Sequence, residues 1–147
     1  MNILFYKDFY KTDHIRQYPE GTNMVFSNWT PRSSRTGNDY VIFFGLQYFI
    51  KKYLIEEFRA FFKTDKAIIL KEYKDFMEST LGACFPLDHI EYLHDLQYVP
   101  LEIRAVPEGA KSKIGVPLLT IHNTDPKCYW LVNFIETLIS CVLWKLT

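Results

Sequence analysis

The apolar segment Tyr129–Trp144 limits the possible folds of this chain more than any other feature. It follows Asn123-Thr124-Asp125-Pro126, where an oxygen-bearing cap precedes a proline, and this pattern is typical of a helix start. Large apolar side chains then recur around most of the circumference of the predicted helix, so one packing face could not bury them all. We expect a helix to about Trp144 that needs protein on several sides, with these apolar residues: Trp130, Leu131, Phe134, Ile135, Leu138, Ile139, Val142, Leu143 and Trp144.

Two properties of this segment suggest what surrounds it. Asn133 and Glu136 interrupt it, and it is shorter than the roughly 20 apolar residues that cross a bilayer, so we expect a soluble protein without a membrane partner. The sequence ends at Thr147 without a glycine cap or a polar tail. Because isolated soluble domains seldom expose so much apolar surface, we expect a truncated chain or one that assembles with a partner.

Composition and charge narrow the class of protein further. The 147 residues are 48% hydrophobic and 17% aromatic, which suits a single domain with a real core. Seventeen basic and 17 acidic residues cancel, so no long-range field would gather nucleic acid or an anionic membrane. Lys7 and Asp8 interrupt any export signal, and three widely spaced cysteines do not suggest a disulfide framework. We therefore expect a cytoplasmic protein.

The first half of the chain predicts one extended segment, one loop and one helix. Aromatic and β-branched residues favour an extended Thr22–Thr30, and the Ser- and Arg-rich Pro31–Gly37 ends it as a loop. Asn38 and Asp39 are then plausible caps of a helix. The spacing of four apolar residues predicts its buried face: Ile42, Leu46, Phe49 and Tyr53.

The middle of the chain predicts two further helices. One should run from Asp65 to about Leu81, with Gly82 as its stop, and a shorter one from Pro86 to Leu96. The first presents an apolar stripe that we expect to face inward: Ile69, Tyr73, Phe76 and Met77.

After Pro100 the pattern alternates as a half-buried strand requires. We expect a strand over Leu101–Ala105, a turn at Val106–Gly109 and a returning strand over about Val116–Ile121. Together with the helices, these short antiparallel strands predict an α+β fold.

The residue types that carry chemistry form no complete active site in this sequence. His89 and His94 lie five residues apart, which turns them about 140° from one another on a helix, so we reject a zinc site there. His14 and His122 have no second ligand nearby in the sequence, and we expect structural or surface roles for both. We expect two cysteines of the last helix to be small buried hydrophobes: Cys128 and Cys141. We predict no catalytic residue and no metal ligand in this chain.

Five separated blocks of the sequence resemble nicotinamide phosphoribosyltransferases, the enzymes of NAD salvage. Agreement at five blocks with family-like spacing is far more specific than a single short motif. The blocks are Asp8–Pro19 (DFYKTDHIRQYP), Phe26–Arg35 (FSNWTPRSSR), Phe43–Phe49 (FFGLQYF), Ile103–Gly109 (IRAVPEG) and Asn123–Thr137 (NTDPKCYWLVNFIET). The part between Phe58 and Leu93 matches least distinctly, and we take no functional residue from it.

The resemblance implies a fold and an assembly. Residues 1–147 would be the N-terminal domain of a type II phosphoribosyltransferase, incomplete and without the C-terminal α/β barrel. In the family, that barrel supplies the phosphorylated histidine and the acidic residue that binds the nicotinamide amide. The family works as a homodimer whose active site lies at the subunit interface, with Mg²⁺ bound to the pyrophosphate and ATP as a possible coupled co-substrate. The substrates are nicotinamide and phosphoribosyl pyrophosphate.

Three residues match substrate-binding positions of the family. Tyr10 matches the tyrosine that stacks on the nicotinamide ring across the dimer interface, where an electron-poor pyridinium suits a phenol face. Asp8 matches an aspartate at the same pocket. Arg32 matches an arginine that binds the diphosphate side of phosphoribosyl pyrophosphate, a task suited to a permanently charged donor fork.

Two alternatives to a simple inactive N-terminal part stay open. The chain could be half of a split enzyme that a separate C-terminal polypeptide completes. It could also be a non-catalytic regulatory module that keeps the dimerising surface and forms mixed dimers with active enzyme. The sequence does not decide between them, nor does it fix ATP coupling or the preferred pyridine base.

Overall fold

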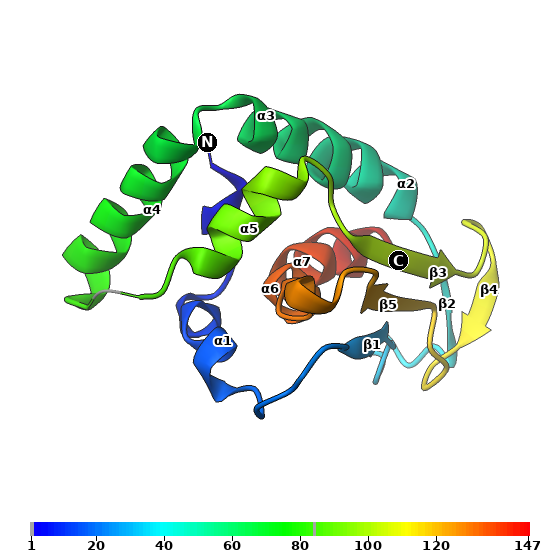
Figure 1. Ribbon diagram of the computed structural model, residues 1–147. Helices are drawn as coiled ribbons and strands as arrows, with labels where there is room; N and C mark the ends of the chain where they lie inside the picture. Colours follow the sequence, from blue (N-terminus) through cyan, green and yellow to red (C-terminus); the bar gives the residue numbers. More distant parts are fainter. Residues whose placement is uncertain (1, 84) are drawn as a thin grey trace.

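The computed structural model describes residues 2–83 and 85–147 and has an α+β architecture, as the sequence predicts. Helices surround one end of a small antiparallel sheet, and a separate two-stranded ribbon extends from the other end (Figure 1). Cys84 lies outside the described residues. The predicted burial of Cys128 and Cys141 can be compared with the structure.

The main sheet has the strand order β1-β5-β3 and is antiparallel throughout. β5 (Leu119–Asn123) lies between β1 (Phe26–Trp29) and β3 (Leu101–Ala105), with Ile121 opposite both Ser27 and Ile103. Alternate residues of β5 are buried, which is the period of a strand with one face on the core. The predicted strand over 101–105 and its antiparallel return are therefore confirmed, although the return begins at Leu119 and not at Val116.

The second sheet was not predicted. β2 (Tyr40–Ile42) pairs with β4 (Lys111–Lys113), and Val41 lies opposite Ser112. The prediction of a helix capped by Asn38 or Asp39 is wrong, because this segment forms β2. Ile42, predicted to lie on the buried face of that helix, is an exposed strand residue.

Gly45 explains where the next helix begins. It has a φ of 101°, a left-handed conformation that only glycine adopts readily, and it separates β2 from α2 (Leu46–Phe49). A Cβ at Gly45 would lie 2.6 Å from Cδ1 of Leu146, so the glycine also allows close approach of the last helix.

A long helical rod follows Gly45 and forms one edge of the molecule (Figure 1). It combines α2, a π-helical stretch over Ile50–Glu57 and α3 (Phe58–Lys63) without an intervening loop. Leu46 and Phe49 of the predicted face are buried as expected, and Tyr53 is half-buried.

The predicted helix from Asp65 to Leu81 is confirmed as α4 (Lys66–Leu81). The Asp65 carboxylate accepts hydrogen bonds from two first-turn amides, and Gly82 ends the helix with a φ of 65°. Ile69, Tyr73 and Met77 are buried, but Phe76 is 39% exposed, so its predicted inward position is wrong. Phe76 instead packs against two rings of the N-terminal segment, tilted relative to Phe5 and stacked with Phe9.

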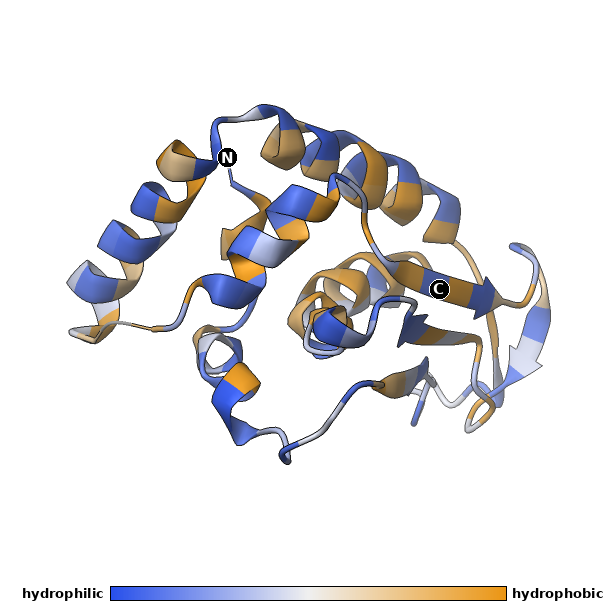
Figure 2. Ribbon diagram, in the orientation of Figure 1, coloured by the Kyte–Doolittle hydropathy of each residue, from blue (hydrophilic) through white to orange (hydrophobic). Residues whose placement is uncertain are grey.

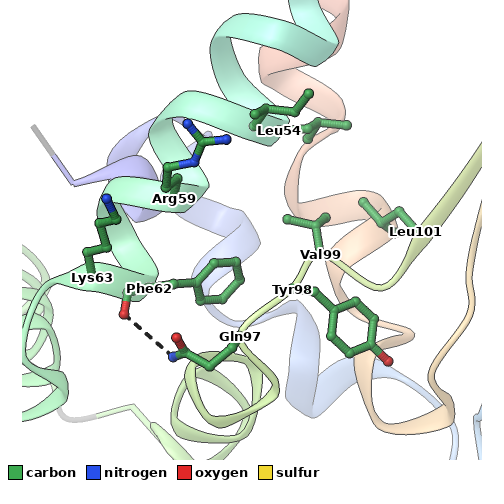
Figure 3. Close-up of a pocket in the computed structure, with 9 residues that line it drawn as sticks. Leu54, Arg59, Phe62, Lys63, Gln97, Tyr98, Val99 and Leu101 are labelled. Atoms are coloured by element: carbon green, nitrogen blue, oxygen red, sulfur yellow. Dashed lines mark hydrogen bonds between the residues drawn. The ribbon is translucent and has the colours of Figure 1, made fainter.

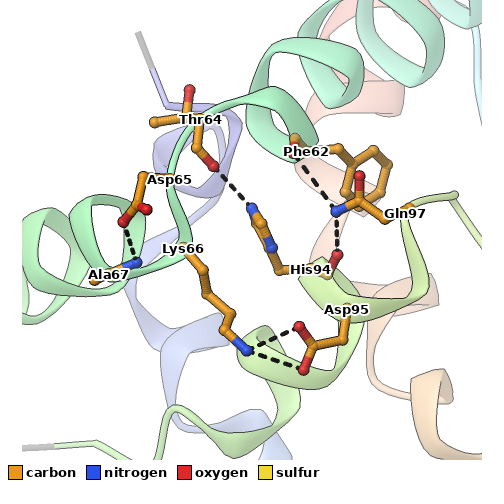
Figure 4. Close-up of polar contacts among 8 residues, drawn as sticks. All are labelled: Phe62, Thr64, Asp65, Lys66, Ala67, His94, Asp95 and Gln97. Carbon is orange, nitrogen blue, oxygen red and sulfur yellow. Dashed lines mark hydrogen bonds and ion pairs between the residues drawn. The ribbon is translucent and has the colours of Figure 1, made fainter.

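Polar contacts join α3, α4 and α5 (Asp88–Leu96), the predicted shorter helix, where their ends meet (Figure 4). His94 contacts the Thr64 carbonyl through Nε2 at 3.0 Å, and Lys66 forms an ion pair with Asp95 at 2.8 Å. These contacts fix the short turn at Thr64 between α3 and α4.

The last helix starts as predicted but is broken. Asp125 accepts from the Lys127 amide, and Pro126 opens a 3₁₀ turn that ends at Cys128. α6 (Leu131–Phe134) and α7 (Glu136–Leu146) then follow, and a bend of 44° separates Pro126–Phe134 from Glu136–Leu146. In residues 2–83 and 85–147, no single helix is long and apolar enough for a bilayer span, and this bent pair passes by length and composition alone.

Burial of the last helix also differs from the expectation at its C-terminal end. Cys128 is buried and Cys141 is exposed, so the predicted burial of Cys141 is wrong. Trp130 is 3% exposed, whereas Trp144 is 63% exposed. Figure 2 shows apolar residues throughout α6 and α7, whereas the outer helices carry apolar and polar stripes. The core therefore gathers around α6 and the first turns of α7.

Candidate functional site

Tyr10 lies on a short 3₁₀ turn over Phe9–Thr12 near the N-terminus. Its side chain is 60% exposed, and its ring lies 5.1 Å from the His14 ring in a tilted arrangement. A large aromatic ring held in solvent on a structured segment can take part in stacking with a ligand or another chain. The position of Tyr10 therefore leaves it free for the stacking role that the resemblance implies.

The neighbouring Lys11 anchors that turn to the last helices. Lys11 is only 3% exposed, and its Nζ donates to the Asn133 carbonyl and to Oε2 of Glu136, both at 2.8 Å. Burying an ammonium group without hydrogen-bond partners would cost free energy. These two contacts offset that cost and allow the Lys11 side chain to point inward. Its Nζ also lies 5.5 Å from the centroid of the Tyr10 ring, so the anchored ammonium borders the exposed aromatic side chain.

Asn133 joins three parts of the molecule. Its Nδ2 donates to the Tyr18 hydroxyl at 2.8 Å, and its Oδ1 accepts from the Ser27 hydroxyl at 3.3 Å. Burial raises the pKa of Tyr18, so this hydroxyl stays protonated at neutral pH. The amide thus ties the N-terminal segment and β1 to α6, where Lys11 also binds.

Asp8 lies beside Tyr10 and also contacts the last helix. Oδ2 of Asp8 accepts a hydrogen bond of 2.6 Å from the Thr137 hydroxyl, which lies next to Glu136. The Asp8 residue is exposed, so its carboxylate can reach a ligand while one oxygen is held. The structure thus brings Asp8 and Tyr10 to one edge, above the first turn of α7.

Lys7 lies in an aromatic environment beneath this edge. Its Nζ lies 5.3 Å from the centroid of the Phe134 ring and 5.6 Å from that of Tyr73, and it donates to the Thr12 hydroxyl at 2.5 Å. Burial lowers the pKa of Lys7 to about 8, and the adjacent Asp8 carboxylate raises it only in part. Desolvation therefore outweighs the attraction of the neighbouring carboxylate.

The two histidines of α5 have separate structural surroundings. The His89 ring packs edge-on against Trp130 at 4.6 Å, and burial lowers the pKa of His89 to about 4. His94 contacts a backbone carbonyl instead, as described above. Across residues 2–83 and 85–147, no three His, Cys, Asp or Glu side chains gather as a metal-ligand set.

Arg32 lies in the predicted loop after β1, which is confirmed. Arg32 is exposed, and the loop is held through its backbone, because Pro31 accepts from the Gly115 amide at 2.8 Å and Asp39 accepts from that of Ile114 at 3.0 Å. The Ser34 hydroxyl adds local hydrogen bonds within the loop.

The three predicted site residues do not form one cluster in this chain. Asp8 and Tyr10 share an edge, whereas the loop after β1 lies on another side of the molecule from the turn that precedes α1 (His14–Gln17) (Figure 1). A pocket that used all three would therefore need additional protein or a second copy.

Sequence reasoning missed the residues that hold this edge in place. Lys11 is separated from Asn133 and Glu136 by more than 120 positions, so no local pattern links them. The sequence did contain one indication of this contact. Lys11 lies in the block Asp8–Pro19, and its two partners lie in the block Asn123–Thr137, and both blocks carry the family resemblance. Two distant blocks that carry complementary polar groups can mark such a contact.

Comparisons with known proteins agree with the fold and the resemblance. Residues 2–87 match the family described as "Nicotinamide phosphoribosyltransferase, N-terminal domain". A relative named nicotinamide phosphoribosyltransferase from Acinetobacter baylyi is 51% identical over 146 residues, covering 94% of this chain and 29% of the relative. One of the same name from Xanthomonas campestris is 32% identical over 147 residues, covering 99% and 30%.

A solved structure supports the fold independently of close sequence similarity. Human nicotinic acid phosphoribosyltransferase superposes with a TM-score of 0.64 at 22% identity, over 92% of this chain and 25% of that one. This chain therefore spans about three tenths of the length of the curated relatives named above, and its fold is that of a phosphoribosyltransferase N-terminal region.

Proposed function

The chain belongs to the nicotinamide phosphoribosyltransferase family, and from that premise we propose that it provides one edge of the site where nicotinamide reacts with phosphoribosyl pyrophosphate. The nicotinamide ring nitrogen would form a bond to the anomeric carbon of the ribose. The bond from that carbon to pyrophosphate would break, and pyrophosphate would leave with the electron pair. The exposed Tyr10 on its buried Lys11 anchor is the observation that carries the proposal.

We assign nicotinamide positioning to Tyr10, with Asp8 beside it. As the ring nitrogen is alkylated it becomes a pyridinium, and an aromatic face stabilises such a cation more than the neutral ring. Asp8 accepts a hydrogen bond from Thr137, so its carboxylate has a fixed place next to Tyr10. Holding the ring in line with the ribose then lowers the barrier by positioning.

Arg32 is assigned to the pyrophosphate side of the second substrate. A guanidinium in an exposed loop can form paired hydrogen bonds with phosphate oxygens and stabilise the leaving charge. We propose that Mg²⁺ enters bound to the pyrophosphate of the substrate, as the family resemblance implies. ATP, as a coupled co-substrate, would bind outside these residues.

We further propose that residues 1–147 form an incomplete N-terminal domain that works in a cytoplasmic homodimer. Asp8 and Tyr10 lie apart from the Arg32 loop (Figure 1). In a homodimer, the edge with Asp8 and Tyr10 could face one active site while the Arg32 loop faces the other. Exposed apolar side chains at the far end of α7 support contact with more protein, since Trp144 and Leu146 are 63% and 46% exposed. Alone, the chain is expected to have no transferase activity.

A chimera tests the proposal directly. Residues 2–147 would replace the matching segment of the Acinetobacter baylyi relative, which is 51% identical in this region. We expect the chimera to form nicotinamide mononucleotide from nicotinamide and phosphoribosyl pyrophosphate, and the 147-residue chain alone to form none. A folded chimera without activity would contradict the proposal, as would turnover by the chain alone.

Mixing experiments separate the shared-site arrangement from the alternatives. A Tyr10→Ala chimera mixed with a chimera whose barrel lacks its catalytic histidine should show the parent's lower KM for nicotinamide, because one site in each mixed dimer is intact. A KM that stays at the Tyr10→Ala value, despite subunit exchange shown by mass spectrometry, would contradict a site shared between subunits. Restored activity on adding a separate C-terminal polypeptide to this chain would identify a split enzyme.

A further inference from the structure

A groove lies between the end of the long helical rod and the segment that follows α5 (Figure 3). It has a volume of about 540 Å³, within the range of roughly 300–1,000 Å³ that is usual for small-molecule sites. Leu54, Phe62, Val99 and Leu101 are among its apolar lining residues. Asp8, Tyr10 and Arg32 do not line it, so the proposed transferase function does not use these walls.

One side of the groove carries two positive charges. Arg59 and Lys63 are four residues apart on α3, and Figure 3 shows both along the same helix beside the groove. Within residues 2–83 and 85–147, neither side chain forms an ion pair or a hydrogen bond.

Acidic residues close in sequence to the lining residues are already paired with other cations. Glu57 pairs with Lys52 at 3.1 Å, and Glu102 pairs with Arg104 at 2.6 Å. Asp95, two residues before Gln97, pairs with Lys66. The charges on this wall are therefore available to an external anion.

The rest of the groove is suited to a flat apolar group. Phe62 and Val99 extend into the space from opposite walls, and the Tyr98 ring lies at its lower end (Figure 3). Tyr98 is 52% exposed and Ile55 is 44% exposed, so burying them under a ligand would remove apolar surface from water. A ligand with an aromatic part and an anionic end matches both walls.

Hydrogen bonds hold the two walls in a fixed relation before any ligand binds. Gln97 ends α5 with a φ of 60°, and it is the one non-glycine residue with positive φ among those described. Its Nε2 donates to the His94 carbonyl at 2.6 Å and to the Phe62 carbonyl at 3.5 Å (Figures 3 and 4). The Gln97 side chain thus links the end of α5 to α3 at the border of the groove.

We propose that this groove binds a small aromatic anion, with a carboxylate or phosphate ester held by Arg59 and Lys63 and the ring between Phe62 and Tyr98. A planar guanidinium can donate two parallel hydrogen bonds to either oxyanion, and Lys63 adds a second positive charge. The groove residues have no part in the proposed transferase function. The two proposals can therefore be tested independently.

Titration calorimetry on the 147-residue chain with 2-naphthoate tests the proposal. We expect saturable one-to-one binding that is at least tenfold weaker in the double variant Arg59→Gln/Lys63→Gln. Lys51→Gln is the matched control, since Lys51 is an exposed cation on the same helical rod and does not line the groove. Its affinity should stay within twofold of the parent, and neutral 2-naphthamide should bind at least fivefold more weakly than 2-naphthoate.

Several outcomes would overturn the assignment. These are no saturable binding by the parent chain up to about 10 mM, equal affinity of the double variant, or equal affinity for 2-naphthamide. Circular dichroism of each variant shows whether the fold is intact, and Tyr98→Ala, which removes an exposed ring, should also weaken binding. Tighter binding of 2-naphthyl phosphate would assign the natural ligand to phosphate esters, and the reverse order to carboxylates.

Discussion

The two proposed substrate-binding edges are built in different ways. The segment with Asp8 and Tyr10 is fixed by side chains, because Lys11 is buried against α6 and α7 and Thr137 holds Asp8. The loop with Arg32 is fixed by its backbone, and the Arg32 side chain itself is exposed. One edge thus depends on side-chain contacts with the last helices and the other on backbone hydrogen bonds from a distant segment.

This difference suggests a division of tasks. A neutral flat ring offers few strong contacts, so a stacking partner must be positioned in advance. A pyrophosphate carries several charges and can order an exposed arginine through its own oxygen atoms. Variants in the two regions should therefore lose different amounts of stability.

Acid should destabilise the fold through the buried His89 of α5. Because burial lowers the pKa of His89 to about 4 from its usual 6.5, the unfolded chain takes up a proton between these pH values that the folded chain does not. The free energy of unfolding should therefore fall by about 3 kcal/mol as the pH drops from 6.5 to 4. Urea unfolding at several pH values measures this slope.

A His89→Gln variant provides the matching comparison. It should lose most of that slope, whereas His122→Gln, on β5, should keep it. An unchanged slope in the His89→Gln variant would show that another group causes the acid sensitivity.

Replacing Lys11 should have the next largest effect. Lys11→Met keeps the apolar stem but removes the ammonium that contacts Asn133 and Glu136, at a cost of about 2 kcal/mol in unfolding free energy. Lys7→Met is the matched control from the same segment, because desolvation already opposes the Lys7 charge. Its stability should lie within about 1 kcal/mol of the parent. Equal losses in the two variants would contradict the anchor role of Lys11.

The Arg32 loop should respond locally. The Ser34 hydroxyl accepts from the amides of Thr36 and Asn38 at 3.2 and 3.1 Å, so Ser34→Ala should cost about 0.5–1 kcal/mol. Hydrogen exchange should become faster at these two amides and remain unchanged at Lys11. Faster exchange in the N-terminal segment would show that the two edges are coupled.

Arg32 itself should contribute least to stability. No partner of its side chain is recorded among residues 2–83 and 85–147, so Arg32→Gln should change the unfolding free energy by less than about 0.5 kcal/mol. In the active chimera, however, the same variant should raise the KM for phosphoribosyl pyrophosphate. A large loss of stability would instead give Arg32 a structural role.

Local signals in the sequence predicted most of the fold. Asp65 and Gly82 bound α4 because a cap oxygen and a left-handed stop act within a few residues. The alternation of apolar and polar residues predicted β3, because this pattern also acts over a few neighbouring residues. The resemblance located Asp8, Tyr10 and Arg32 in segments whose conformations the structure now describes, but their roles remain predictions.

The errors arose where distant parts of the chain decide the outcome. Ile42 fits a helical stripe, yet pairing with β4 and the left-handed Gly45 place it in a strand. Phe76 fits an inward stripe, yet its ring packs against Phe5 and Phe9 of the N-terminal segment and stays partly exposed. The Lys11 anchor depends on residues more than 120 positions away, and no local pattern could reveal it.

The most direct test is the KM for nicotinamide of the chimera with Tyr10→Ala. Loss of a stacking partner worth about 1–1.5 kcal/mol predicts a KM about tenfold higher, with Tyr10→Phe close to the parent because the ring is kept. Stability should hardly change in either variant, since the Tyr10 ring is largely exposed. An unaltered KM and kcat in a folded Tyr10→Ala chimera would contradict the claim that this edge holds the nicotinamide ring.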